Sequence, residues 1–162
     1  MNLTTSKPNQ MNKQPHHLYR HECIKLLLKR MDYTMQSFAE DAKVSITTVF
    51  NWMRKPESCR DETNIETAFL RKVGQTKVIP VKKAKAILRN SELSLNISQN
   101  EYIRVMMDRC KITVNALAKE SGIERNQVFF WTQGRKESEK FDETLKIYFT
   151  KAIQNYRNSL YL

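Results

Sequence analysis

The chain has 162 residues, with 28 Lys and Arg against 17 Asp and Glu, and therefore a formal net charge of +11. This excess favours a polyanionic partner, and the length allows one ordinary domain or two small ones. We find no apolar run of membrane-spanning length and no signal-peptide core, so we expect no membrane partner and a cytoplasmic, nucleoid-associated location.

The composition favours an all-α fold, because only 3 Gly and 4 Pro interrupt several runs with helical spacing. Residues 1–15 are polar and contain two prolines, and we expect them to form a flexible N-terminal arm. With Lys7 and Lys13, the arm either follows a phosphate backbone or a minor groove or is an inert tail. The sequence leaves both interpretations open.

Residues that carry chemistry in enzymes and metal sites form no recognisable set. His16, His17 and His21 lack Cys or carboxylate partners at a known metal-ligand spacing. The three cysteines are odd in number, far apart and without a CxxC pair, which fits a reducing cytoplasm. There is no nucleophile–His–acid arrangement and no phosphate loop, so we expect no metal, no cofactor and no enzymatic activity.

Residues 16–74 are predicted to form a first four-helix unit. Its first helix, 16–31, carries apolar residues at i, i+3, i+4 and i+7, namely Ile24, Leu27, Leu28 and Met31. Pro56 ends the third helix, and Asp61 is placed to cap a fourth one. The apolar stripe of that fourth helix is Ile65, Ala68, Phe69 and Val73.

Between these helices, residues 34–52 have the spacing of a helix, a tight turn and a second helix, and the pattern recurs at 113–134. The two copies are in ungapped register 79 positions apart, with identical residues at Thr34/Thr113, Ala39/Ala118, Val49/Val128 and Trp52/Trp131. Gly122 suits the positive φ that ends the first helix of the later copy. Lys43 stands at this place in the earlier copy. Since positive φ costs a non-glycine residue roughly 1 kcal/mol, we expect the first turn to differ in detail.

Residues 75–97 are predicted to be a basic linker. The segment 71–89 contains seven Lys and Arg and no acidic residue. Pro80 breaks the run, and the following VKKAKAIL predicts a short basic helix. Its lysines either track phosphates or are merely solvated, and the candidates for phosphate contact are Lys82, Lys83 and Lys85.

Residues 98–162 are predicted to form the second unit. Ser98 and Glu101 have the spacing of a capping box at its first helix. A long C-terminal helix carries the apolar residues Leu145, Tyr148, Phe149, Ala152, Ile153 and Tyr156. This stripe is longer than a small domain needs. We therefore expect part of it to pack against the first unit, a homodimer partner or another protein.

The second helix of each copy has an outward face, because at about 100° per residue the buried Val and Trp occupy only one side. In the helix 45–55 the outward residues are Thr47, Phe50, Asn51 and Arg54. In the helix 124–133 they are Asn126, Phe129, Phe130 and Gln133, with Arg125 at the start. Arginine suits guanine O6 and N7, asparagine suits adenine, and phenylalanine suits thymine methyl groups. For Phe130, packing on a neighbouring helix is an equal alternative.

Together the two copies resemble the DNA-binding domain of lambda repressor and Cro-like proteins, most closely at 103–138, IRVMMDRCKITVNALAKESGIERNQVFFWTQGRKES. The match comprises the Ala of the first helix, the turn Gly, the buried Val and Trp, and a Gly after the second helix. The copy at 24–58 has Lys43 and Lys55 in place of the two glycines. The resemblance implies DNA binding and usually transcriptional repression, often in phages and mobile elements.

The resemblance also implies roles for individual side chains. Base contacts are implied for residues at the start and outward face of each second helix, Ile46, Thr47, Phe50, Asn51, Arg125, Asn126, Phe129 and Phe130. Phosphate contacts are implied for Gln36 and Asn115. Later in the same helices, Arg54 and Gln133 are further base candidates. Lys55, Arg135 and Lys136, which follow these helices, are further phosphate candidates.

We therefore expect a sequence-specific double-stranded DNA-binding protein, a transcriptional regulator that reads two unlike half-sites. Three alternatives stay open. One is the DNA-targeting region of a transposase or recombinase, although the stripe of a fourth helix counts against the three-helix versions. The second is a replication or partition protein of a mobile element. The third is a protein-interaction module without DNA specificity.

Overall fold

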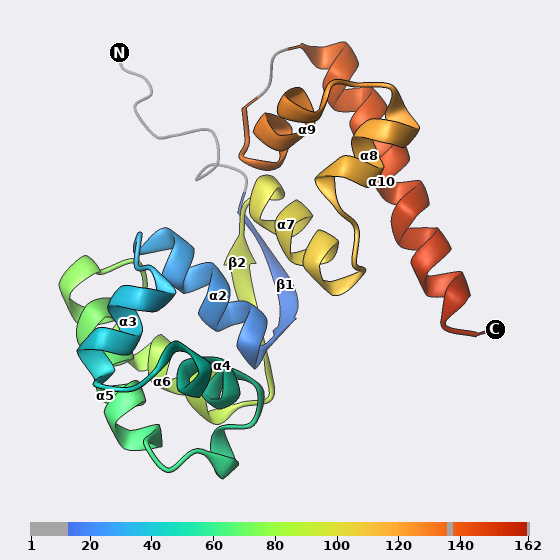
Figure 1. Cartoon of the computed structure of the whole chain (residues 1–162). Helices are drawn as coiled ribbons and strands as arrows, with labels where there is room; N and C mark the ends of the chain where they lie inside the picture. The colour runs from blue at the N-terminus through green and yellow to red at the C-terminus, as the bar shows by residue number, and fades with distance from the viewer. Residues whose placement is uncertain (1–12, 136–137, 162) are drawn as a thin grey trace, which may run out of the picture. The chain divides into compact units, whose positions relative to one another are not determined.

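The computed structural model describes residues 13–135 and 138–161 (Figure 1). The chain divides into two compact units, a first unit of His16–Leu95 and a second unit of the residues from Asn96 onward with the segment before His16. The elements in chain order are β1 (Gln14–Tyr19), α2 (Arg20–Arg30), α3 (Met35–Ala42), α4 (Ile46–Arg54), a short 3₁₀ helix (Pro56–Ser58), α5 (Glu62–Thr76), α6 (Val81–Arg89), β2 (Glu92–Ile97), α7 (Gln99–Arg109), α8 (Val114–Ser121), α9 (Arg125–Thr132) and α10 (Glu139–Ser159).

The described chain is mostly helical, as predicted, but the all-α prediction misses a small sheet formed by β1 and β2. The Arg20 amide, just after β1, donates to the Ser91 carbonyl, just before β2, over 2.9 Å, so the strands are antiparallel. β2 has the two-residue periodicity of a half-buried strand, with Leu95 and Ile97 buried and Ser94 and Asn96 exposed. This alternation is the sequence signal that could have predicted a strand within the segment predicted to be a linker.

The first strand also corrects the predicted N-terminal boundaries. Gln14 and Pro15 lie in β1 rather than in an arm, and the first helix begins at Arg20 rather than at residue 16. The helix begins there because the Tyr19 amide donates to the Glu22 carboxylate over 2.9 Å. Residues 1–12 of the predicted arm lie outside the described residues.

The sequence repeat is also a backbone repeat. The starts of α2, α3 and α4 precede those of α7, α8 and α9 by the same 79 positions. Thr34 and Thr113 cap α3 and α8, accepting from the amides of Ser37 and Ala116, each over 3.0 Å. The turns after α2 and α7 also have a left-handed residue at an equivalent position, φ 52° at Asp32 and φ 57° at Lys111. Each of these details recurs within a separate unit.

The expected difference between the α3–α4 turn and the α8–α9 turn is not found. Lys43 adopts φ 59° and Gly122 adopts φ 74°, so both turns use the left-handed conformation. The first copy therefore carries the strain of a lysine in this region, which costs about 1 kcal/mol.

Exchanging the residue types at these two turns is expected to change stability in opposite directions. A Cβ on Gly122 would meet no heavy atom within 4 Å, so Gly122→Ala adds backbone strain alone. We expect it to lower the free energy of unfolding by about 1 kcal/mol and Lys43→Gly to raise it by up to about 1 kcal/mol. Urea denaturation of the two variants measures both changes. A loss of stability in Lys43→Gly would contradict the strain assigned to that turn.

Each unit has its own aromatic core. In the first unit, Phe38, Trp52 and Phe69 are fully buried, and their ring centroids lie 5.8 to 6.3 Å apart. In the second unit, Trp131 packs on Phe149 with centroids 5.9 Å apart. The stripe predicted for the fourth helix, Ile65, Ala68, Phe69 and Val73, is the buried face of α5. Asp61 precedes α5 as its N-cap residue, but its side chain accepts no capping hydrogen bond.

The short basic helix predicted at 81–88 is α6, but it is part of the first unit and not of a free linker. α6 contacts α5 and α2, and it buries Ala84 and Ile87 completely. The reason is its amphipathic pattern, which places these two residues on one side and the cations on the other. The boundary of the first unit therefore moves from residue 74 to Leu95.

Within residues 13–135 and 138–161, no helix combines the length and apolarity needed to cross a bilayer.

Candidate nucleic-acid interface

The helix α4 has one buried side and one open side. On one side, Val49, Trp52 and Met53 are buried in the interior of the first unit. On the opposite side, the predicted residues Ile46, Thr47, Phe50, Asn51 and Arg54 are all exposed, with 41% of Ile46 and 40% of Phe50 accessible. Large apolar side chains this exposed are informative because they lie together with amide, hydroxyl and guanidinium groups. We call these five residues the α4 face.

Arg20, which sequence reasoning missed, anchors the C-terminal end of α4. Its Nη1 donates to the carbonyls of Trp52 and Met53 over 3.2 and 3.4 Å, and its guanidinium lies 4.7 Å from the centre of the Trp52 ring. Its Nε donates to the Leu88 carbonyl of α6 over 3.2 Å. Burial lowers the pKa of Arg20, which the nearby Glu66 partly opposes. One buried cation therefore joins α2, α4 and α6.

The helix α9 is exposed at its start and along one side. Arg125, Asn126 and Phe129 are exposed, with 43% of Phe129 accessible, whereas Phe130 and Gln133 are half-buried. The Phe130 ring packs on Phe129, with centroids 5.9 Å apart, and the guanidinium of Arg135 lies 5.1 Å from its centre. We call the five predicted residues, Arg125, Asn126, Phe129, Phe130 and Gln133, the α9 face.

Arg125 is held in place by a residue of the preceding helix. Its Nε donates to Oδ1 of Asn115 over 2.6 Å. Both residues are exposed, and both were predicted from sequence, Arg125 for bases and Asn115 for phosphates. The hydrogen bond directs the guanidinium from the first turn of α9 and limits its rotamer freedom, which lowers the entropy lost on binding.

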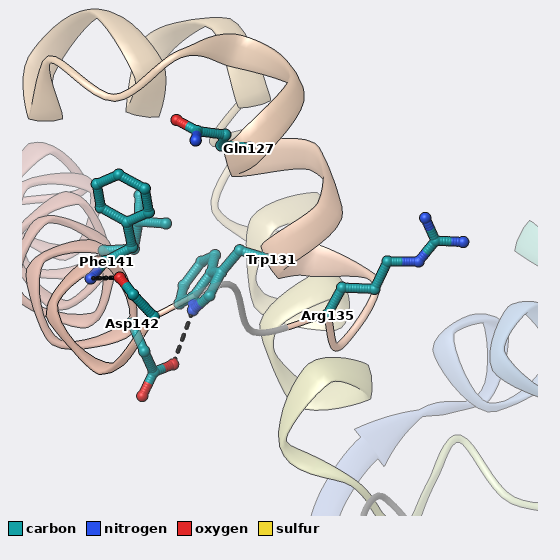
Figure 2. A pocket seen from close by; sticks show the side chains of 7 residues that line it. Gln127, Trp131, Arg135, Phe141 and Asp142 are labelled. Atoms are coloured by element: carbon teal, nitrogen blue, oxygen red, sulfur yellow. Dashed lines mark hydrogen bonds between the residues drawn. The ribbon is translucent and has the colours of Figure 1, made fainter.

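The buried side of α9 is fixed by polar contacts that sequence reasoning missed. The indole Nε1 of Trp131 donates to Asp142 over 2.9 Å, and Asp142 pairs with Lys146 at 3.0 Å. Figure 2 shows the indole directed at Asp142 on α10, while Arg135 extends away from it. Nη1 of Arg104 donates to the Thr132 carbonyl over 3.1 Å, so an arginine also meets the C-terminal end of α9.

The predicted phosphate-contacting residues divide into three groups. Gln36 and Asn115 are exposed near the starts of α3 and α8, and Lys55 and Arg135 are exposed just after α4 and α9. Lys82 and Lys85 are exposed on α6, whereas Nζ of Lys83 donates to the Ser94 carbonyl over 3.1 Å. Lys136 lies outside the described residues. Among the described candidate cations, Lys55, Lys82 and Lys85 are exposed, whereas the side-chain ends of Lys83 and Arg135 contact the Ser94 carbonyl and the Phe130 ring.

A groove of about 510 Å³ borders the C-terminal half of α4. It brings together predicted Asn51, Arg54 and Lys55 with Ser58 and Arg60, which sequence reasoning missed. The available signal was the presence of Arg54 and Lys55 just before Pro56 and of Arg60 shortly after it. The groove has three cations against one carboxylate, that of Asp61, and this net positive charge at the edge of the α4 face suits an oxyanion such as phosphate.

The described residues contain no cluster of three His, Cys, Asp or Glu able to hold a metal ion. Comparison of the chain with family models, with curated protein sequences and with solved structures gives no match.

Proposed function

We propose that the chain is a sequence-specific double-stranded DNA-binding protein with two helix-turn-helix units, α3–α4 and α8–α9. The observation that carries the proposal is the exposure of the α4 face, and of Arg125, Asn126 and Phe129 in the α9 face, on helices whose opposite sides are buried. A helix with side chains is about 10–12 Å across, which matches a major groove about 12 Å wide. Each unit therefore presents a rigid helix of suitable size.

The chemistry of the two faces supports reading of bases. Arg125 offers a guanidinium to guanine O6 and N7, and Asn51 and Asn126 offer amides to adenine N6 and N7. Phe50 and Phe129 offer apolar contact to thymine methyl groups. Since the two faces differ at nearly every position, we propose that they read unlike half-sites.

The proposed biological role is transcriptional regulation, in the form of repression by a protein of a phage, plasmid or other mobile element. A protein held on a promoter by two reading helices excludes polymerase by occupying the site. The net charge of +11 supports the attraction to DNA that precedes such recognition.

Duplex binding is expected to depend steeply on salt. If about five cations displace counterions, the slope of log K against log salt is about −4 to −5, and affinity falls by about 10²- to 10³-fold between about 50 and 200 mM salt. Fluorescence anisotropy with a labelled duplex of mixed sequence measures the slope. A nearly flat dependence, or no mobility shift with any duplex, would favour a protein-interaction module instead.

The double variant Lys82→Gln, Lys85→Gln separates the two interpretations of the α6 lysines. Both side chains are exposed and neither is needed for the buried side of α6. If both contact phosphates, the salt slope becomes shallower by about 2. An unchanged slope would mean that these lysines are solvated and that other cations meet the DNA backbone.

A further inference from the structure

The second unit has a groove of about 280 Å³ between α7 and α10, lined on the α10 side by residues from Lys146 to Arg157. Tyr102 of α7 and Phe149 and Ile153 of α10 contribute apolar surface, and Lys146 and Arg157 contribute charge. Gln99, Thr150 and Gln154 complete the lining. None of these residues belongs to the α9 face, so the groove is a separate feature of the unit.

The groove corresponds to the place where α6 lies in the first unit. The buried residues of α5, Ile65, Phe69 and Val73, align with Leu145, Phe149 and Ile153 of α10 at a constant separation, and both phenylalanines pack on the unit's tryptophan. In the first unit, α6 packs on α2 and α5. The equivalent helices α7 and α10 form the walls of the groove.

Individual contacts support the same equivalence. Two residues of the first unit lie close to α6. Nε of Arg20 donates to the Leu88 carbonyl over 3.2 Å, and a Cβ added to Gly74 would lie 3.8 Å from Cγ2 of Val81. By the helix alignments, their counterparts are Gln99 and Gln154, and both line the groove. A helix thus occupies in one unit the surface that is hollow in the other.

The two surfaces differ in the sign of the charge at one equivalent position. In the first unit, Glu66 of α5 interacts electrostatically with Arg89 of α6 and with Arg20. Its counterpart in α10 is Lys146, which pairs with Asp142 at 3.0 Å. Arg157, whose counterpart is the cation Lys77, lies further along the same groove. A basic helix like α6 would therefore be repelled, whereas carboxylates would find two cations at the groove's edge.

The apolar part of the groove is suited to protein contact. Tyr102 is half-buried, and it lies with Phe149 and Ile153 in a lining that mixes aromatic and aliphatic surface with polar ends. Tyrosine and arginine are enriched at protein interfaces, because each combines a large contact area with hydrogen-bonding groups. We propose that this groove binds an acidic amphipathic helix of a partner protein, with apolar residues at i and i+3 or i+4 inward and carboxylates toward Lys146 and Arg157.

The probe for this proposal is a helical peptide that keeps the apolar residues of α6 and replaces its cations by carboxylates. It is a stapled, fluorescein-labelled peptide of Val81–Arg89 in which Lys82, Lys83, Lys85 and Arg89 are replaced by Glu, compared with the unaltered basic sequence. Anisotropy with the full chain should show binding of the acidic peptide at least about tenfold tighter than that of the basic one. Lys146→Glu and Arg157→Glu should each weaken the acidic peptide by about tenfold.

Lys151→Glu is the matched control, because Lys151 is exposed on α10 but does not line the groove. It should change the affinity by less than about twofold. Lys146→Glu also removes the ion pair with Asp142, so it changes the fold's contacts as well as the groove's charge. Arg157→Glu tests the groove's charge without removing that ion pair. Equal binding of the two peptides, binding unaffected by Arg157→Glu, or no binding would overturn the proposal. A dimer of the chain that Arg157→Glu dissociates would overturn it as well, since the occupant would then be a second copy.

Discussion

Arg125→Ala is expected to weaken specific DNA binding by about 1–3 kcal/mol and to relax the choice at one base pair. The side chain is exposed at the first position of α9, and its Nε is held by Asn115 at 2.6 Å. A bidentate contact from such a pre-positioned guanidinium distinguishes guanine from the other bases. Competition with duplexes that differ at single base pairs measures both the loss and the position.

The matched control for this prediction is Lys151→Ala, which removes one exposed cation from α10. It should lower affinity slightly and equally for all sequences, because a distant charge carries no base information. Asn115→Ala should have a smaller effect than Arg125→Ala, since the guanidinium remains but loses its support. An unchanged sequence preference in Arg125→Ala would refute the role assigned to this residue.

Phe69→Ala is expected to lower the stability of the first unit by about 3–5 kcal/mol. Phe69 is fully buried, with ring centroids 6.1 Å from Phe38 and 6.3 Å from Trp52. Its removal leaves a cavity beneath the helix that carries the α4 face. In a Trp131→Phe background, Trp52 is the remaining tryptophan, and its fluorescence during urea denaturation reports on the first unit.

Phe129→Ala is the control for that experiment, because Phe129 is 43% exposed and lies on the α9 face. We expect its effect on stability to stay within about 0.5 kcal/mol. A similar loss of stability in both variants would mean that the aromatic cluster does not hold the first unit together.

Local periodicity allowed much of the helical structure to be predicted from sequence. The spacing of Val49 with Trp52 and of Val128 with Trp131 placed all four side chains inside, and the structure buries them. The same spacing predicted that Thr47, Asn51 and Asn126 point outward, and all three are exposed. Helical periodicity is a property of a few neighbouring residues, so it is readable without tertiary information. The DNA contacts of these residues remain predictions.

What sequence reasoning missed depends on residues distant in the chain. Arg20 meets carbonyls of Trp52, Met53 and Leu88, and Trp131 meets Asp142, pairings that no local pattern encodes. The sheet was missed because each strand is short and its partner is far away in the sequence. The place of α6 was missed because the cation-rich surface masked the buried pair Ala84 and Ile87.

Selection of bound sites from a random duplex library most directly tests the claim that α4 and α9 are the reading helices. It should be run on the natural chain, on an α4 variant with Phe50→Ala and Asn51→Ala, and on an α9 variant with Arg125→Ala and Asn126→Ala. All four positions are exposed, so the variants should fold. We expect one enriched sequence for the natural chain, with each variant losing the preference in a different part of it. The absence of any enriched sequence, or the same sequence enriched by all three proteins, would contradict the proposed function.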